Sequence, residues 1–542
     1  MVRLQQRIQI LYDILHCSMD SPIVVILTTT FITALGWLFL SQRRPKDFPP
    51  GPTPLPIIGN LHQIDEGLPY LTFNDWSKQY GPIVGLRLGT KFAVVLHDSG
   101  LVQDLIVKQG MSMASRPPRY VSQEHVIPEG RHIHPVFMRD DWAMKLRAVT
   151  KEYMVGRGLL DLVPMAKAIG MRLVNAIYNA KGDWSDDLAE WALEVQTSQI
   201  TGAPVEHFGR QYVHDYHQMT IDLEDIMVSR AADIIPLLRW VPARFAAWKR
   251  HAPTVRKQVL NAYNKVMDVA KQHHGATGSY HAIIPKLLSD SVDPNTDPDH
   301  RMTETEITMM MGGLLDAGFA STVATFETIV LYLTKYPKVL RKVQAEIDSV
   351  FGKGEDQPMP EMINRDDLPY LHAVVLEVLR CHPTTPIILP RETEEVTFVR
   401  GYRIPKGTTV MTNVWTIQRD PTYYENPEVF DPERYVKHPL GIKEGAPSLN
   451  RKAVYTFGFG RRECPGKDFF FQQMELVMSQ VIWAFDFKAT GPLDTDPRTG
   501  FIFGVASRPK KLNVDFIPRR SSENMATEKR KADIRLHEIL GF

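Results

Sequence analysis

One segment of the sequence places a single cysteine between glycines and beside an arginine, an arrangement suited to metal binding. It reads Phe457-Gly-Phe-Gly460-Arg-Arg462-Glu-Cys464-Pro-Gly466. Gly460 and Gly466 permit backbone turns that side chains would obstruct, so the chain can fold closely around a thiolate. Phe457 would shield the sulfur from water, and Arg462 offers a planar fork of donors for a carboxylate. A flat iron macrocycle with carboxylate arms, held by Cys464, meets these requirements; the alternative is a buried cysteine in a glycine-rich turn.

A charged pair lies inside an apolar stretch upstream of this segment. Glu377 and Arg380 are three residues apart, so a helix would place them on one face, close enough to pair. The surrounding residues are strongly apolar, and a charge pair on a buried face requires further partners. The segment Asp431-Pro-Glu-Arg434-Tyr is the expected source of those partners.

These motifs, in this order, resemble those of the cytochrome P450 superfamily, and the resemblance covers roughly residues 50–518. It implies haem b with Cys464 as the axial ligand of iron. In that family an arginine from the second segment joins the E-x-x-R pair behind the haem, so Glu377, Arg380 and Arg434 are expected to be structural. The implied fold is mainly α with a small β region. It forms one haem-binding catalytic domain over residues 57–518, followed by a charged C-terminal tail at 519–542.

The helix expected to face the haem begins near Thr303. Thr303-Glu-Thr-Glu306 has the form of a capping box, and the apolar run after it continues to Lys335. Within this run, Ala-Gly-Phe-Ala-Ser-Thr at 317–322 resembles the family's oxygen-binding motif. Gly318 and a hydroxyl bonded back to a helix carbonyl are expected to open the helix locally and make room for dioxygen.

One position of this motif departs from the family pattern, because Ala320 stands where the family has an acid. Ser321 is the expected proton-delivery hydroxyl, assisted by Thr322. Without the acid, protons would arrive through water or through Asp316, one turn earlier on roughly the same face. The alternative for Asp316 is a surface or water-bonded carboxylate.

Other expected contacts to haem and substrate are carried over from the resemblance. Leu389-Pro-Arg391 resembles the segment whose basic residue binds a haem propionate. Trp142 resembles the tryptophan of an early W-x-x-x-R motif, but the arginine is offset, so Lys145 and Arg147 remain alternatives. Residues expected along the substrate pocket are Phe319, Ile387, Ile388 and Val505.

The chain contains no G-x-G-x-x-G motif after a strand, so we expect electrons to come from a separate NADPH–cytochrome P450 reductase. Basic residues near the cysteine segment are candidates for its docking face, with scattered surface charges as the alternative. They are Arg451, Lys452, Arg461 and Lys467.

The N-terminal region predicts membrane attachment. Residues 22–40 are apolar and just long enough to span a bilayer core, after a short non-cytoplasmic leader at 1–21. A cleaved signal peptide is the alternative, but no small-residue cleavage site follows. A basic and proline-rich hinge occupies 41–56, and its charges favour a cytoplasmic catalytic domain on the endoplasmic reticulum membrane.

Composition agrees with this interpretation. A net charge of +1 argues against a nucleic-acid partner, and three cysteines provide no disulfide framework. We therefore expect a haem-thiolate monooxygenase that hydroxylates a small, largely apolar organic substrate with O2. The overall character is similar to fungal secondary-metabolism members of the family, whose substrates include polyketide or aromatic intermediates. The alternatives are a haem-thiolate isomerase, dehydratase or peroxide-using enzyme and, more remotely, a non-enzymatic haem-binding protein.

Overall fold

A computed structural model describes residues 44–127, 141–180, 184–227, 231–273, 282–297, 301–360 and 365–541, with isolated helical residues between 26 and 36. The expected leader and almost all of the expected anchor at 22–40 lie outside the described residues. Within the described part, one helix is long and apolar enough to cross a membrane, α12, and most of it is buried inside the protein.

The described elements are mainly helices. The helices are α3 Pro69–Tyr80, α4 Ser99–Val102, α5 Asp141–Met154, α6 Arg157–Asn179, α7 Ser185–Thr201, α8 Arg210–Met227, α9 Ala231–Ile234, α10 Ala247–Gln272, α11 Ile283–Val292, α12 Glu304–Lys335, α13 Pro337–Phe351, α14 Pro369–Cys381, α15 Val414–Ile417, α16 Glu433–Lys437, α17 Lys467–Ala484 and α18 Ser522–Leu540. The strands are β1 Ile83–Leu88, β2 Lys91–Leu96, β3 Ile387–Glu392, β4 Thr397–Val399, β5 Tyr402–Ile404, β6 Thr409–Asn413, β7 Phe485–Ala489, β8 Phe501–Ile502, β9 Arg508–Pro509 and β10 Val514–Pro518. Short 3-10 and π turns connect several of them.

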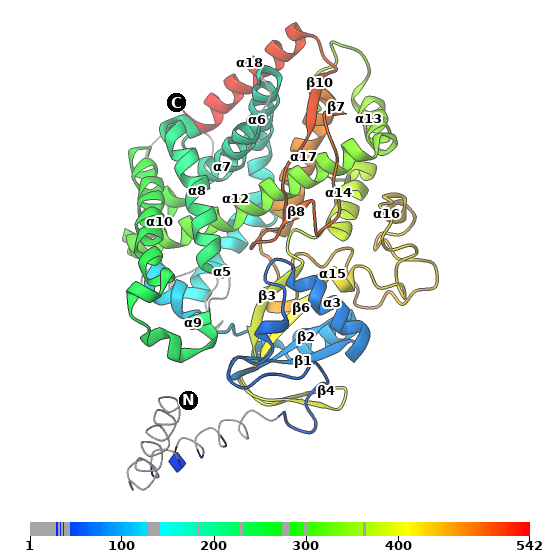
Figure 1. Ribbon diagram of the computed structural model, residues 1–542. Coiled ribbons are helices and arrows are strands. Elements are labelled where there is room, and N and C mark those ends of the chain that lie inside the picture. Colours follow the sequence, from blue (N-terminus) through cyan, green and yellow to red (C-terminus); the bar gives the residue numbers. More distant parts are fainter. Residues whose placement is uncertain are drawn as a thin grey trace, which may run out of the picture.

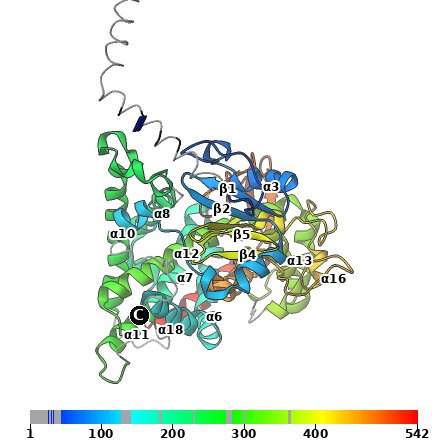
Figure 2. The same cartoon turned by 90° about the horizontal axis from the view of Figure 1, so that it is seen from below.

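The helices form the bulk of the molecule, and the largest sheet lies at one side of them (Figures 1 and 2). This sheet has the strand order β1-β2-β6-β3, in which β2 and β6 run parallel and the other pairs antiparallel. The pairing of β3 with β6 shifts register between Ile388 and Arg391. Such a bulge releases backbone groups from the ladder, and Leu389 and Pro390 lie inside it. The expected fold, mainly α with a small β region, is confirmed.

Helix α12 crosses the centre of the molecule (Figure 1). Thr303 is its N-cap, and the Thr303 and Glu306 side chains bond each other's backbone N–H as a capping box. It ends at Lys335, as the sequence predicts. Because apolar residues surround it on most sides, the helix is buried along most of its length. It is one uninterrupted 32-residue α-helix, so the expected local opening at Gly318 is not present as a break in the helix.

The charged C-terminal segment forms an ordered helix. Ser521 caps α18 by accepting a hydrogen bond from the Asn524 N–H. Apolar residues on one face, including Met525, Leu536 and Leu540, are buried in the main core. The charged residues of the expected tail therefore form the outer face of a helix that packs beside α6 (Figure 1).

Candidate active site

The cysteine segment folds into a tight loop before α17. The Cys464 N–H donates to the Phe457 carbonyl at 2.8 Å, which closes the loop around the cysteine. Gly458 and Gly460 have φ values of 77° and 53°, in the left-handed region that favours glycine. The sequence interpretation named Gly460 correctly but missed Gly458. Gly466 has φ −85°, which any residue can adopt, so the backbone reason expected for Gly466 is wrong.

The Cys464 thiol keeps an accessible surface although it lies deep among protein atoms. Burial raises its pKa to about 11, so binding a metal there displaces a proton. The Phe457 ring packs at 5.3 Å from both Phe470 and Phe471 of α17, which covers one side of the loop. A Cβ at Gly466 would lie 3.9 Å from the Cys464 sulfur, which is ordinary van der Waals contact, so Gly466 adjoins the thiol without being required there by space.

Three distant segments meet beside this loop through arginine side chains that bond backbone carbonyls. Arg391, from β3, donates to the carbonyls of Met113 and Phe459. Arg462, from the cysteine loop, donates from Nε to the Ala114 carbonyl at 2.7 Å. Arg116 donates from one Nη1 to the carbonyls of Leu389 and Pro390, at 2.8 and 3.1 Å. These carbonyls are the ones that the β3 bulge releases.

Positive charges gather in this arginine cluster of Arg116, Arg391 and Arg462. Arg116 and Arg391 are 9% and 2% exposed. Burial, followed by the charge of Arg462, lowers the pKa of Arg391 to about 10. Burial and then three neighbouring arginines likewise lower the pKa of Arg116. Within the described chain, the charges recorded as acting on these two guanidiniums are all positive.

The cluster and the thiol together fit haem b. A buried cation without a counter-charge is unfavourable, so these arginines require anions. The two propionate groups of haem are planar carboxylates that guanidinium forks can bind. The accessible thiol of Cys464 could supply a ligand for the iron.

The sequence interpretation missed Arg116. Its signal was present in Ser115-Arg116-Pro-Pro, where an arginine stands in an extended, proline-bounded segment. Lys145 lies 3.4 Å from Glu306 of α12, whereas Arg147 is exposed, and both stay alternatives for the propionate contact. Trp142 is partly buried on the core side of α5. Its contact with a propionate stays a prediction.

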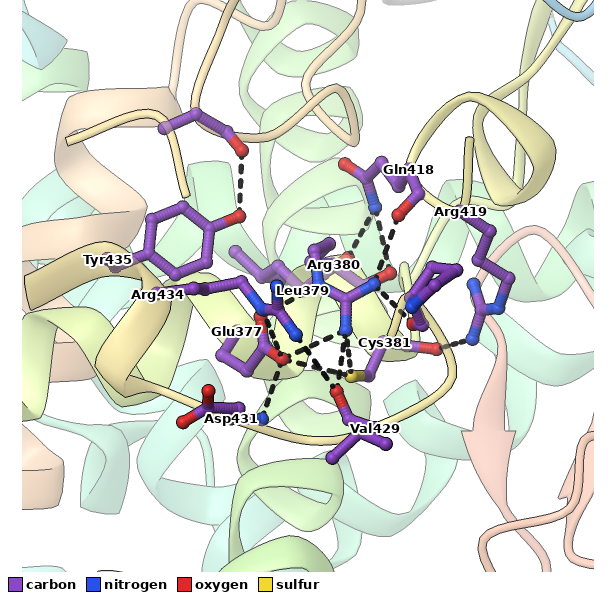
Figure 3. A network of polar contacts seen from close by, with 12 residues as sticks. Glu377, Leu379, Arg380, Cys381, Gln418, Arg419, Val429, Asp431, Arg434 and Tyr435 are labelled. Carbon is purple, nitrogen blue, oxygen red and sulfur yellow. Dashed lines mark hydrogen bonds and ion pairs between the residues drawn. The ribbon is translucent and has the colours of Figure 1, made fainter. Parts of the chain in front are cut away.

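The expected ion-pair network is confirmed (Figure 3). Glu377 and Arg380 have fully buried side chains and form two hydrogen bonds, at 2.7 and 2.9 Å. Arg434 donates to the same carboxylate at 3.1 Å, and so does the Asp431 N–H at 2.8 Å. Remaining donors of Arg380 reach the carbonyls of Gln418, Pro427 and Val429. Cys381 lies against this network, and burial raises its pKa to about 12, which agrees with an inert thiol.

Ser321 and Ala317 lie on the same partly open face of α12. The Ser321 hydroxyl donates to the Ala317 carbonyl at 2.9 Å, and Ala317 is exposed. Thr322, the next residue, is also partly accessible. The back-bonded hydroxyl that the sequence predicts is therefore present. Phe319, expected on the pocket wall, is instead buried against Tyr216 of α8 at 5.4 Å between ring centroids.

Asp316 faces the helices that cover α12. Its carboxylate accepts hydrogen bonds from Tyr216 of α8, at 2.6 Å, and from Tyr263 of α10. Burial raises the pKa of Asp316 to about 7, although both tyrosine hydrogen bonds oppose this shift. At 100° per residue, Asp316 and Ser321 point about 140° apart around the helix. The hydrogen-bond partners of Asp316 therefore lie on a different side of α12 from Ser321.

A model of the family Cytochrome P450 matches residues 49–516. "Cytochrome P450 monooxygenase grgG" from a Penicillium species is 29% identical over 499 residues, covering 88% of each chain. "Cytochrome P450 monooxygenase 58" from Postia placenta is 29% identical and covers 90% of this chain and 92% of its own. "Cytochrome P450 monooxygenase fogE" from Aspergillus ruber is 29% identical and covers 91% of each.

Proposed function

This chain belongs to the cytochrome P450 family, and from that premise we propose that Cys464 holds the iron of haem b through its thiolate. It is a haem-dependent monooxygenase. The observation that carries the assignment of the site is the junction of one accessible, deeply placed thiol with a buried arginine cluster. When bound, haem supplies the activation of dioxygen, and thiolate ligation favours cleavage of the O–O bond.

The remaining residues of the proposed site bind the haem propionates or shape the cysteine loop. Arg391, Arg462 and Arg116 bind the propionates and neutralise their charge. Trp142 borders them from α5. Phe457, Gly460 and Gly466 shape the loop that presents the thiol.

Ser321 holds a proton on its Oγ. In the described arrangement it donates this proton to the Ala317 carbonyl. Rotation about χ1 would redirect the proton into the site, with Thr322 as the neighbouring hydroxyl.

The proposed substrate is a small, largely apolar organic molecule, an intermediate of fungal secondary metabolism such as a polyketide or aromatic compound. Support comes from the fungal monooxygenases that the chain resembles. The proposed reaction hydroxylates this molecule with O2 and two electrons.

A separate NADPH–cytochrome P450 reductase is the proposed electron source. Of the basic residues first considered, Lys452 and Lys467 both pair with Glu463, and Arg451 lies over the Tyr423 ring at 3.5 Å. Arg461 is exposed. Exposed Arg147 and Lys151 share one face of α5, whose last residue adjoins Gly466. Arg147, Lys151 and Arg461, which are all exposed, are therefore the better candidates for contacts with an acidic partner.

Membrane attachment is part of the proposal, with the catalytic domain on the cytoplasmic side of the endoplasmic reticulum. Between α9 and α10, the residues Leu237, Trp240 and Phe245 are 75%, 85% and 72% exposed. Arg244 and Arg250 flank them and are also exposed. Exposed aromatic side chains beside basic ones favour the lipid headgroup region. We name Leu237, Trp240 and Phe245 the apolar patch.

The test of the proposed function is spectroscopic and catalytic. The reduced, haem-loaded protein with carbon monoxide should show the red-shifted Soret band of thiolate ligation, and Cys464→Ala should lose both this band and activity. With reductase and NADPH, the monooxygenase should consume both NADPH and O2 as product forms. An unchanged thiolate band in Cys464→Ala would refute the assignment of Cys464 as the iron ligand. Product formation without NADPH would favour an isomerase, dehydratase or peroxide-using enzyme.

A further inference from the structure

A column of hydroxyl groups runs along one face of α12 beyond the open part that holds Ser321. The Ser321 hydroxyl donates to the Ala317 carbonyl at 2.9 Å, and one turn later the Thr325 hydroxyl donates to the Ser321 carbonyl at 2.8 Å. Residues four apart lie nearly above one another on a helix, so both hydroxyls share this face. Ser321 is partly accessible, whereas Thr325 is buried. The open part of the face therefore ends between these two residues.

Thr384 covers the face at the point where it closes. It lies between α14 and β3, and its Oγ1 is 2.7 Å from Thr325 Oγ1. A hydroxyl carries one proton, and a carbonyl can only accept. Because the Thr325 proton is used on the Ser321 carbonyl, Thr384 must be the donor in the hydroxyl pair. A directed chain of two hydrogen bonds thus leads from Thr384 through Thr325 to the backbone of Ser321.

Thr384 is itself held by the segment next to β9. Its carbonyl accepts a hydrogen bond from the Ser507 N–H at 2.7 Å. The Ser507 Oγ lies 3.0 Å from Nε2 of His382, whose ring stacks on Phe501 of β8 at 3.4 Å between ring centroids. Thr384, Ser507 and His382 are all buried. Thr384 is therefore a well-supported point of attachment for α12.

The part of α12 around Ser321 needs such support. A carbonyl that accepts a side-chain hydroxyl as well as its helical N–H is held less tightly, and this back-bonding tends to bend a helix. In α12 it occurs at two carbonyls in succession, those of Ala317 and Ser321. The hydrogen bond from Thr384 ties the second of these turns to the surrounding structure.

We propose that Thr384, acting through Thr325, is a positioning residue that fixes where the Ser321 hydroxyl lies. The inference rests on the proposed monooxygenase function and on the proposed role of Ser321, and it assigns a residue outside α12 to the same proton chemistry. Without the Thr384 donor, Thr325 Oγ1 loses its buried partner, and the turn from Ser321 to Thr325 can shift against the segment that carries Thr384. The Ser321 hydroxyl then moves relative to the haem site.

The experiment uses carbon monoxide as the probe, because the C–O stretching frequency of the reduced, haem-loaded chain responds to polar groups near the bound gas. The full chain is compared with Thr384→Val, Thr384→Ser, Ser321→Ala and the double variant Ser321→Ala with Thr384→Val, and Tm is measured for each. Thr325→Val breaks the same hydrogen bond from α12 and is the second variant should Thr384→Val hold little haem. Thr334→Val is the matched control, since it removes a buried hydroxyl that donates to the Val330 carbonyl near the C-terminal end of α12.

We expect Thr384→Val to shift the C–O band by part of the shift that Ser321→Ala causes. Adding Thr384→Val to Ser321→Ala should move the band no further, because no hydroxyl is left at position 321, while Tm falls by the same amount in both backgrounds. Thr384→Ser should keep the band of the unmodified chain, and Thr334→Val should leave the band in place whatever its Tm.

The inference is overturned if Thr384→Val leaves the band in place, in which case the threonine pair is a packing contact only. It is also overturned if Thr384→Val shifts the band equally with and without the Ser321 hydroxyl, or if Ser321→Ala itself leaves the band unmoved. Absence of the thiolate spectrum in the unmodified chain would refute the proposed function instead.

Discussion

Replacing Asp316 by Asn tests whether this carboxylate serves the packing of the covering helices or the delivery of protons. Asn keeps the shape and an acceptor for Tyr216 or Tyr263, but it cannot ionise. Because the pKa of Asp316 is raised to about 7 in the folded chain, Asp316 binds its proton more tightly there than in the unfolded chain. It therefore contributes stability at low pH, and that contribution is lost as the pH rises from about 4 to about 7.

The size of the effect follows from the shift. A rise from the ordinary value of 3.8 to about 7 corresponds to about 4 kcal/mol over the whole window. Between pH 6 and 8 the contribution of Asp316 to the free energy of unfolding falls by about 1.4 kcal/mol. For a chain of 542 residues, with an unfolding entropy of about 2.1 cal/mol/K per residue, this is about 1 °C in Tm. The Tm of the unmodified chain should thus fall by about 1 °C more than that of Asp316→Asn across this pH interval.

The same variant separates packing from proton delivery. Since Asp316 faces Tyr216 and Tyr263, Asp316→Asn should form as much product per NADPH as the unmodified chain at equal haem content. Ser321→Ala is the comparison, because it removes the hydroxyl on the open face and should lower product per NADPH while peroxide rises. Equal pH dependence of Tm in both chains would refute the assigned burial of the carboxylate. A loss of coupling in Asp316→Asn that resembles Ser321→Ala would show that protons pass through Asp316 after all.

Two further perturbations test the remaining parts of the structure. Glu377→Gln leaves the buried guanidiniums of Arg380 and Arg434 without their carboxylate, so it should cost about 3–5 kcal/mol, measured as a lower Tm and a lower haem content; an unchanged Tm would mean that the network is not stabilising. Trp240→Ser with Phe245→Ser, in a chain lacking residues 1–42, should weaken binding to lipid vesicles by about 10- to 100-fold through lost apolar burial. Equal vesicle binding would exclude the apolar patch as a membrane contact.

Short sequence patterns correctly predicted the features that depend on residues close together in the chain. The bounds of α12 followed from a capping box and a continuous apolar run, and the pairing of Glu377 with Arg380 followed from helical spacing. The role of Arg116 could not be read in this way. Its partners, Leu389 and Pro390, lie more than 270 residues away in the chain, and their carbonyls are free only because β3 has a bulge. A single sequence contains no signal for that tertiary register.

The glycines of α12 show how such tertiary contacts change the meaning of a motif. A Cβ at Gly318 would lie 2.3 Å from the terminal amide of Gln196 in α7, so glycine at this position accommodates the Gln196 side chain rather than a break in α12. A Cβ at Gly312 would lie 2.2 Å from the Tyr263 ring, the same ring whose hydroxyl donates to Asp316 one turn later. Gly312 therefore lets α10 approach closely enough for that hydrogen bond to form. The carboxylate of Asp316 is bound by the covering helices, and Ala320 stands in the acid's place, so we propose Ser321 and Thr322 on the open face as the residues that carry the proton chemistry.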